Sequence, residues 1–213
     1  MTGQHGPGPT DLSRPGQEGL SPADVLAQPI PLPYPPELPA GLPARPRVLQ
    51  LTDADAVSRG LVDGTPRARA SDQEVRACLE LVQATARAID PRPRIVCAAS
   101  TATATSHLDV MTASGGNTWL IRRGLDGADR ALLEELDDLA EIQLAAHRPG
   151  RKRPGDPADL VILVGQDRIF AAAVRRLRLL GIPTWLLVPG HLVAADLYTA
   201  ACVVTYIGPR RGA

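Results

Sequence analysis

The 213-residue chain is poor in lysine, cysteine and aromatic side chains, and each shortage limits its chemistry. All but one of its 23 basic residues are arginine, so a reaction that needs an internal lysine has a single candidate, Lys152. The three cysteines, Cys78, Cys97 and Cys202, are far apart without Cys-x-x-Cys spacing, which argues against a disulfide framework or a cysteine zinc site. Aromatic residues are 3% of the chain, too few for base stacking to contribute much to nucleic-acid binding.

Long hydrophobic runs are also missing. No run approaches the roughly 18 consecutive apolar residues that a membrane span needs, and the first residues lack the basic start and apolar stretch of a signal peptide. We therefore expect a cytoplasmic protein that does not contact a membrane. The formal net charge is zero, so any basic surface for a nucleic acid would have to be a local patch.

The N-terminal part of the chain is rich in proline. Twelve of the 21 prolines fall within the first 46 residues, where proline alternates with apolar residues in PIPLPYPPELPAGLP. This pattern favours polyproline II over packed structure. We expect residues 1–45 to form a disordered tail rich in proline and glycine, residues 46–208 to form one domain, and residues 209–213 to be a short basic C-terminus. The alternative is that the tail is a ligand for a protein that binds proline-rich segments.

From Arg47 onward, short apolar runs alternate with helical patterns. The apolar runs predict strands at 48–51, 94–99, 118–121, 160–164, 183–188 and 202–207, and helical patterns cover 71–89, 127–147 and 170–181. Ser71 and Glu74 have the spacing of a capping box at the start of the first of these helices. This order predicts an α/β fold of three layers (α/β/α), with a mainly parallel sheet of about five or six strands covered by helices on both faces.

Acidic residues follow several of the predicted strands. Asp53 follows the first strand, Asp126 and Asp129 open the helix after the third, and Asp167 follows the run at 160–164. Carboxylates that converge at the carboxyl ends of parallel strands form an oxygen site suited to Mg²⁺ or Mn²⁺, which activates water and neutralises the charge that develops on a phosphodiester. The alternative is that Asp126 and Asp129 only cap the helix they open and that Asp167 caps the next one.

Three segments together resemble the NYN domain, a family of PIN-like nucleases. DLVILVGQDRIFAAAVRRLRLLGIPTWLLVPG is similar to that family's strand, S-G-D-x-D-F, helix, L-x-x-x-G and strand. The first strand with DADAV is similar to the D-x-x-N-V opening, and RRGLDGADRALLEEL resembles the middle acidic segment. The resemblance covers residues 47–208. It implies a PIN-like (Rossmann-like) domain and a metal-dependent ribonuclease or RNA-processing factor, with Asp53, Asp129 and Asp167 as catalytic and metal-binding acids.

The chain departs from this family pattern at several positions. Gly165 and Gln166 replace Ser-Gly, Ile169 replaces the second aspartate, and Ala56 stands where the opening motif has asparagine. Two hypotheses follow. The protein is a ribonuclease whose metal site is weakened, or it is an inactive PIN-like module that binds RNA or a protein.

A third hypothesis is a haloacid-dehalogenase-like phosphatase, because DADAV fits D-x-D-x-[TV] and Ser100 and Thr101 imitate that family's second motif. That chemistry requires a lysine beside the nucleophile, and Lys152 lies in a loop broken by proline and glycine.

For RNA contact, the densest basic segment is Arg148, Arg151, Lys152 and Arg153. Two other groups of arginines, Arg122 with Arg123 and Arg175 and Arg176 with Arg178, are more typical of solvated surfaces. We assign no role to His107 and His191. The sequence does not decide whether the chain forms a homo-oligomer.

Overall fold

The computed structural model describes residues 31–35, 38, 41–61, 69–114, 117–124, 126–146, 157–190 and 192–207. Within these residues the strands are β1 (Val48–Asp53), β2 (Arg94–Ser100), β3 (Thr118–Arg122), β4 (Leu160–Val164), β5 (Thr184–Pro189) and β6 (Val203–Ile207). The helices are α2 (Ala54–Gly60), α3 (Asp72–Ile89), α4 (Thr101–Ser106), α5 (Leu108–Ala113), α6 (Gly127–Ala146), the 3₁₀ helix η1 (Arg168–Phe170), α7 (Ala171–Leu179) and α8 (Ala195–Ala200).

The strands form one sheet of six in the order β3-β2-β1-β4-β5-β6, and every neighbouring pair is parallel. The predicted α/β class and each of the six predicted strands are confirmed. All five residues of β4 are buried, because helices cover both faces of the sheet and a strand inside such a sheet must be apolar on both sides.

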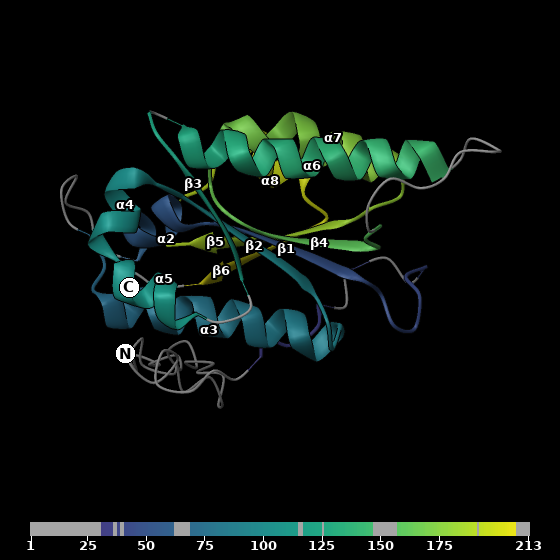
Figure 1. Cartoon of the computed structure of the whole chain (residues 1–213). Helices are drawn as coiled ribbons and strands as arrows, with labels where there is room; N and C mark the ends of the chain where they lie inside the picture. Colours follow the sequence, from purple (N-terminus) through teal and green to yellow (C-terminus); the bar gives the residue numbers. More distant parts are fainter. Residues whose placement is uncertain are drawn as a thin grey trace, which may run out of the picture.

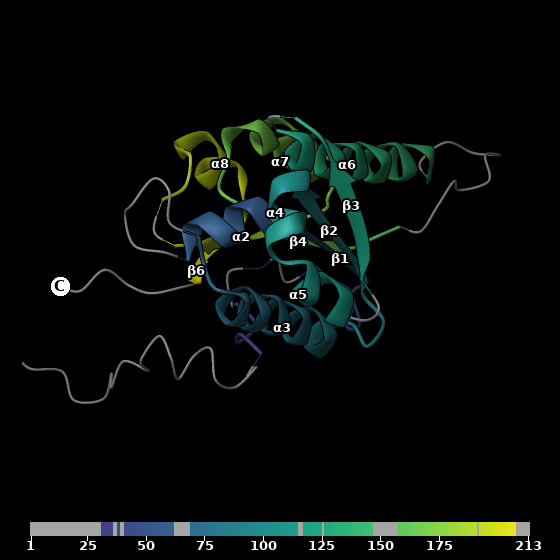
Figure 2. The ribbon, with the colours of Figure 1, turned by 60° about the vertical axis from the view of Figure 1, so that its left-hand side comes forward.

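The two helical layers create two cores. One face of the sheet packs against α6, α7 and α8, and the other packs mainly against α3 and α5 (Figure 1). The helices α2 and α4 lie between these layers at the carboxyl ends of the strands (Figure 2). Among the described residues, no helix is long and apolar enough to cross a membrane.

The long helices begin and end where their sequences indicate. At the start of α3, the Ser71 side chain accepts the Glu74 N–H while the Glu74 carboxylate accepts the Ser71 N–H, which is the predicted capping box. The chain leaves α7 through Gly181, whose φ of 80° is favourable for glycine and strained for other residues.

The described part of the expected tail packs against the α3 side of the domain. Leu38 is buried, Leu32 and Leu42 contact the same core, and the Leu32 N–H donates to Thr85 Oγ1 of α3 at 3.0 Å. We call the described residues of this segment, 31–35, 38 and 41–46, the proline strap. The sequence analysis placed these residues in the tail, and in the structure the leucines between the described prolines cover an apolar surface of the domain.

The strand order places a crevice at the carboxyl ends of β1 and β4. From β1 the chain builds outward through β2 to β3, and from β4 it builds the other way through β5 to β6. Connections on the two sides of such a switch point leave the sheet toward opposite faces, which opens a crevice between them. Asp53 ends β1, and Asp167 follows β4 by three residues, so the topology brings these two sequence-predicted acids to one place.

Candidate functional site

Asp53 lies at the last position of β1 and begins α2. Its carboxylate accepts the N–H of Asp55 at 2.9 Å, so it caps α2, a role that the sequence analysis did not assign to it. The side chain is nevertheless 2% exposed. An isolated cap on a surface helix would be solvated, so burial of this carboxyl group is the first sign of a second role.

Asp129 approaches from the opposite helical layer, in the first turn of α6. The loop before this helix turns sharply, with positive φ angles at Gly124 and Asp126. Asp129 is 8% exposed, and its Oδ1 is buried without a hydrogen-bond partner in the described structure. A buried acceptor without a partner is costly, which points to a ligand that the protein atoms do not supply.

The two carboxyl groups interact directly. Burial, and then the negative charge of Asp129, raise the pKa of Asp53 to about 8. Burial, and then the charge of Asp167, raise the pKa of Asp129, while a hydrogen bond from the protonated Asp53 lowers it. Two carboxyl groups in one dry place cannot both ionise cheaply, so the pair holds a proton or needs a cation.

Asp129 borders an open cleft of about 690 Å³ at the switch point, whereas the buried Asp53 is not one of its lining residues. Its lining residues are Asp55, Arg59, Arg69, Ser100, Thr101, Ala102, Thr103, Arg123, Gly124, Asp126, Asp129 and Asp167. Asp167 caps η1 by accepting the Ile169 N–H at 3.2 Å, and its side chain is exposed in the cleft. The structure therefore brings Asp129 and Asp167 to one cleft, with Asp53 buried beside Asp129, and it gives Asp53 and Asp167 a capping role as well.

The Asp53 and Asp129 pair supplies only part of the ligand set of a divalent cation. Among the described residues, no group of three or more histidine, cysteine, aspartate or glutamate side chains is arranged to hold a metal ion. The complete three-acid ligand set expected from the sequence is thus not formed. Mg²⁺, however, is commonly held by one or two carboxylates, with waters and substrate phosphates completing its shell, and the partnerless Asp129 Oδ1 is an oxygen donor of this type.

Asp55 contributes a fixed polar edge to the cleft. Its Oδ1 accepts hydrogen bonds from the N–H of Ser100 at 3.0 Å and from the Ser100 hydroxyl at 3.1 Å. This contact joins the start of α2 to the end of β2. Ser100, considered from the sequence only as an imitation of a phosphatase motif, is thereby a structural partner of Asp55.

Sequence reasoning missed two of the three arginines that line the cleft. Arg59 and Arg69 were not singled out, whereas Arg123 was named only as part of a basic pair. Among the described residues, no ion pair engages these three guanidinium groups. Arg59 follows Asp55 by one helical turn, a spacing that could have indicated it. Arg69 has no comparable signal, since it reaches the cleft only through the tertiary fold.

None of the other basic candidates is among the described residues that line the cleft. Arg148, Arg151, Lys152 and Arg153 lie outside the described residues, as does His191. Arg122 pairs with Glu134 at 2.9 Å, and Arg176 pairs with Asp137 and Glu141. Arg122 and Arg176 therefore belong to the solvated surface around α6 and α7.

Ile169 does not lie in the acidic site. It is half-buried and packs against the core on the α6 and α7 side of the sheet, and it is absent from the cleft lining. The residue that replaces the family's second aspartate therefore belongs to the packing of the domain.

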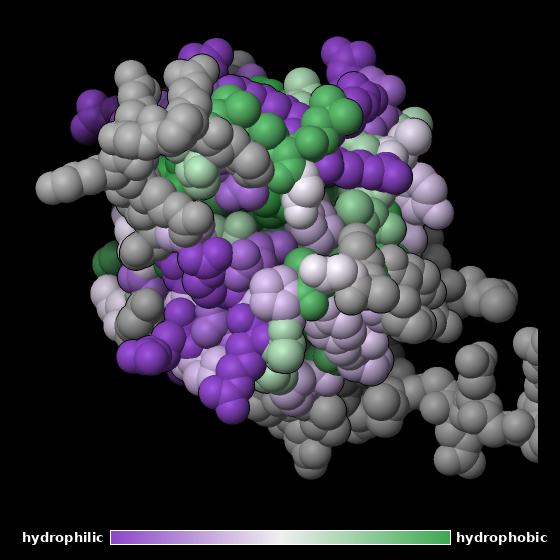
Figure 3. All heavy atoms as spheres, turned by 90° about the vertical axis from the view of Figure 1, so that its right-hand side faces the viewer, coloured by the Kyte–Doolittle hydropathy of each residue, from purple (hydrophilic) through white to green (hydrophobic). Residues whose placement is uncertain are grey.

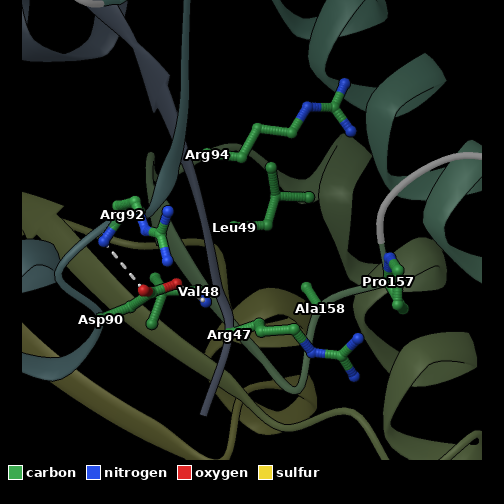
Figure 4. Close-up of a pocket in the computed structure, with 8 residues that line it drawn as sticks. All are labelled: Arg47, Val48, Leu49, Asp90, Arg92, Arg94, Pro157 and Ala158. Atoms are coloured by element: carbon green, nitrogen blue, oxygen red, sulfur yellow. Dashed lines mark hydrogen bonds between the residues drawn. The ribbon is translucent and has the colours of Figure 1, made fainter. Parts of the chain in front are cut away.

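A smaller pocket of about 220 Å³ lies at the opposite end of the strands (Figure 4). Arg47 and Arg94 border it, but Arg47 binds Asp159 through two nitrogens and Arg94 pairs with Glu135. Figure 3 shows hydrophilic and hydrophobic side chains interspersed over this end of the molecule. Because most of its charge is already paired, this pocket is a weaker candidate than the cleft.

The fold and the cleft define a doubly wound α/β protein with an acidic and arginine-lined site at its topological switch point. Comparisons with protein-family models, curated proteins and solved structures find no match to this chain.

Proposed function

We propose that the protein is a divalent-metal-dependent ribonuclease that hydrolyses phosphodiester bonds in the switch-point cleft. The observation that carries this proposal is the buried pair of Asp53 and Asp129, with a partnerless carboxylate oxygen beside a cleft lined by three arginines. Carboxylates suit a hard cation, and arginines suit phosphate oxygens. A site that holds both is complementary to a phosphodiester with its metal ion.

Each group in the cleft has a distinct role in this mechanism. Asp53 and Asp129 would hold Mg²⁺ or Mn²⁺, which supplies an activated water and neutralises charge on the phosphate. Asp167, exposed in the same cleft, would orient the attacking water and accept its proton while the P–O bond to the leaving oxygen breaks, and that oxygen would take a proton from solvent. Arg59, Arg69 and Arg123 bind the nonbridging phosphate oxygens of the RNA and hold the strand in the cleft.

The cleft lining favours recognition of the nucleic-acid backbone. None of the described lining residues is aromatic, so stacking does not select particular bases there. Arginine contacts to phosphates position a strand without reading its sequence. We therefore expect cleavage with little base preference.

The phosphatase hypothesis has less support. An aspartate nucleophile must reach the phosphorus atom, whereas Asp53 is 2% exposed. The one lysine of the chain, Lys152, lies outside the described residues. The inactive module that binds RNA or a protein remains the alternative to a ribonuclease.

The test is cleavage of a fluorescent single-stranded RNA in the presence of Mn²⁺. Asp53→Asn and Asp129→Asn should each lower the rate by at least about tenfold, because they weaken the binding and positioning of the cation. Asp138→Asn is the matched control, since Asp138 is exposed on the same helix α6 as Asp129. Its rate should equal that of the wild type.

The alternatives give different outcomes in the same assay. Cleavage that is equal in the wild type and both variants would contradict the proposed site. RNA binding without cleavage would favour the inactive module. Hydrolysis of para-nitrophenyl phosphate, with RNA left intact, would favour the phosphatase.

A further inference from the structure

A chain of hydrogen bonds beside the cleft joins the buried Ser58 and His107 to the exposed Asp72. The Oγ of Ser58 in α2 lies 3.0 Å from Nε2 of His107, and Nδ1 of His107 lies 2.6 Å from Oδ1 of Asp72, the first residue of α3. His107 itself lies at the junction of α4 and α5. With the proton on Nδ1, the imidazole donates to Asp72 and accepts the Ser58 hydroxyl hydrogen, so one tautomer satisfies all three groups.

The order of serine, imidazole and carboxylate is that of a nucleophilic triad, but burial argues against nucleophilic chemistry. Ser58 is 1% exposed and His107 is 4% exposed. A nucleophile must contact its substrate, and this hydroxyl has no access to solvent. The hydrogen bonds must therefore serve another purpose, which is set by what the three residues hold in place.

Ser58 and its neighbours fix the backbone around two cleft arginines. The Ser58 carbonyl accepts the Ala70 N–H at 2.8 Å, and Arg69 Nη1 donates to Ser106 Oγ at 3.3 Å. The segment from Arg69 to Asp72 is thus held by Ser58, Ser106 and His107. Arg59 directly follows Ser58 in α2, so both Arg59 and Arg69 depend on this set of contacts for their position in the cleft wall.

We infer that His107 is a positioning residue that fixes Arg59 and Arg69 for binding of the substrate phosphates. This role rests on the proposed function. Hydrogen bonds from guanidinium to phosphate require close and directed contact, so a small shift of α2 or of the 69–72 segment weakens substrate binding. The Asp129 side of the cleft, which comes from α6, is held separately.

The test compares His107→Gln and Ser58→Ala with the wild type. A glutamine reaches only one of the two partners of His107, and alanine removes only the Ser58 hydroxyl. Ser114→Ala is the control, because the Ser114 hydroxyl bonds to carbonyls of its own helix α5, Val110 and Met111. KM and kcat for a single-stranded RNA with Mn²⁺ are measured, together with the salt dependence of RNA binding.

Both variants should raise KM by about three- to tenfold and change kcat by less than about twofold, since phosphate binding weakens and the metal-binding acids stay. The slope of log affinity against log salt should fall in magnitude by about 0.7 for each phosphate that the variant no longer binds. The control should match the wild type in all three values. A merely structural role would lower the melting temperature and leave KM and the salt slope unchanged.

Unchanged KM and salt slope in folded His107→Gln and Ser58→Ala would overturn the positioning role, while cleavage by the wild type would leave the proposed function intact. A fall in kcat alone would also overturn it. A wild type that neither binds nor cleaves RNA would overturn both proposals. If His107→Gln fails to fold, Ser58→Ala decides, because it deletes one oxygen atom and leaves the contact between His107 and Asp72.

Discussion

The chemistry of single residues in the cleft is governed by two carboxyl groups that water cannot fully solvate. Asp53 and Asp129 come from opposite sides of the crevice, and burial raises the pKa of each. Arg59 lowers both pKa values, but its effect comes last among the causes. A carboxyl pair of this kind costs stability in the absence of a cation, and a bound cation removes that cost.

This cost predicts a pH-dependent effect of Asp53→Asn. The Asp53 pKa is about 8 in the folded protein, against its usual value of 3.8, so between these pH values the folded state holds a proton that the unfolded state has lost. The contribution of Asp53 to the free energy of unfolding therefore falls as pH rises from about 4 to 8. Asparagine keeps the helix cap and does not titrate. Without divalent ions, the variant should be more stable than the wild type at pH 8 by at least about 1 kcal/mol.

Urea unfolding at pH 5 and pH 8 measures this effect. The advantage of Asp53→Asn should shrink at pH 5, where Asp53 is protonated in the folded wild type. Asp138→Asn, at an exposed position of α6, is the control variant in the same measurement. A variant that is less stable than the wild type at pH 8 would refute the buried charge pair.

At the scale of whole elements, the sequence predicted the strands well because the sheet is parallel and covered on both faces. Strands in such a sheet become continuous apolar runs, and LVILV predicted β4 with its observed bounds. The short helices α2, α4, α5 and α8 have six or seven residues each and were not predicted. Segments of this length contain too few turns for an apolar periodicity to emerge.

The element η1 explains the departure from the family motif at Ile169. The half-buried Ile169 packs against the core on the α6 and α7 side, while Asp167 at the start of η1 faces the cleft. Ile169→Asp should therefore lower the free energy of unfolding by about 1 to 2 kcal/mol without tightening Mn²⁺ binding, because it places a carboxylate against apolar side chains. Thermal melting and isothermal titration with Mn²⁺ give the two values.

Ile121→Asp is the control for this experiment. Ile121 lies on the edge strand β3 and is 49% exposed, so the same exchange there should cost little stability. Tighter Mn²⁺ binding by Ile169→Asp in a stable protein would show instead that the side chain reaches the acidic pair.

At the scale of the whole molecule, the doubly wound topology assembles the cleft from residues far apart in the sequence. The sequence predicted the acids because each follows a strand, and the carboxyl ends of parallel strands share one edge of the sheet. It could not predict Arg69 in the cleft or the contact between Ser58 and His107, whose residues are 49 positions apart. Such contacts depend on how α2, α3 and the α4–α5 junction pack together, and no local pattern encodes that packing.

The proline strap extends this global packing beyond the predicted domain boundary. Leu38, which is 5% exposed, belongs to the core between the sheet and α3, and its N–H donates to the Pro35 carbonyl at 3.2 Å. Leu38→Ala should therefore lower the free energy of unfolding by about 2 to 3 kcal/mol, as expected for a leucine removed from a core. Leu192→Ala should cost far less, because Leu192 is 69% exposed. Urea unfolding of both variants compares them directly, and equal stabilities would mean that the strap does not contribute to the core in solution.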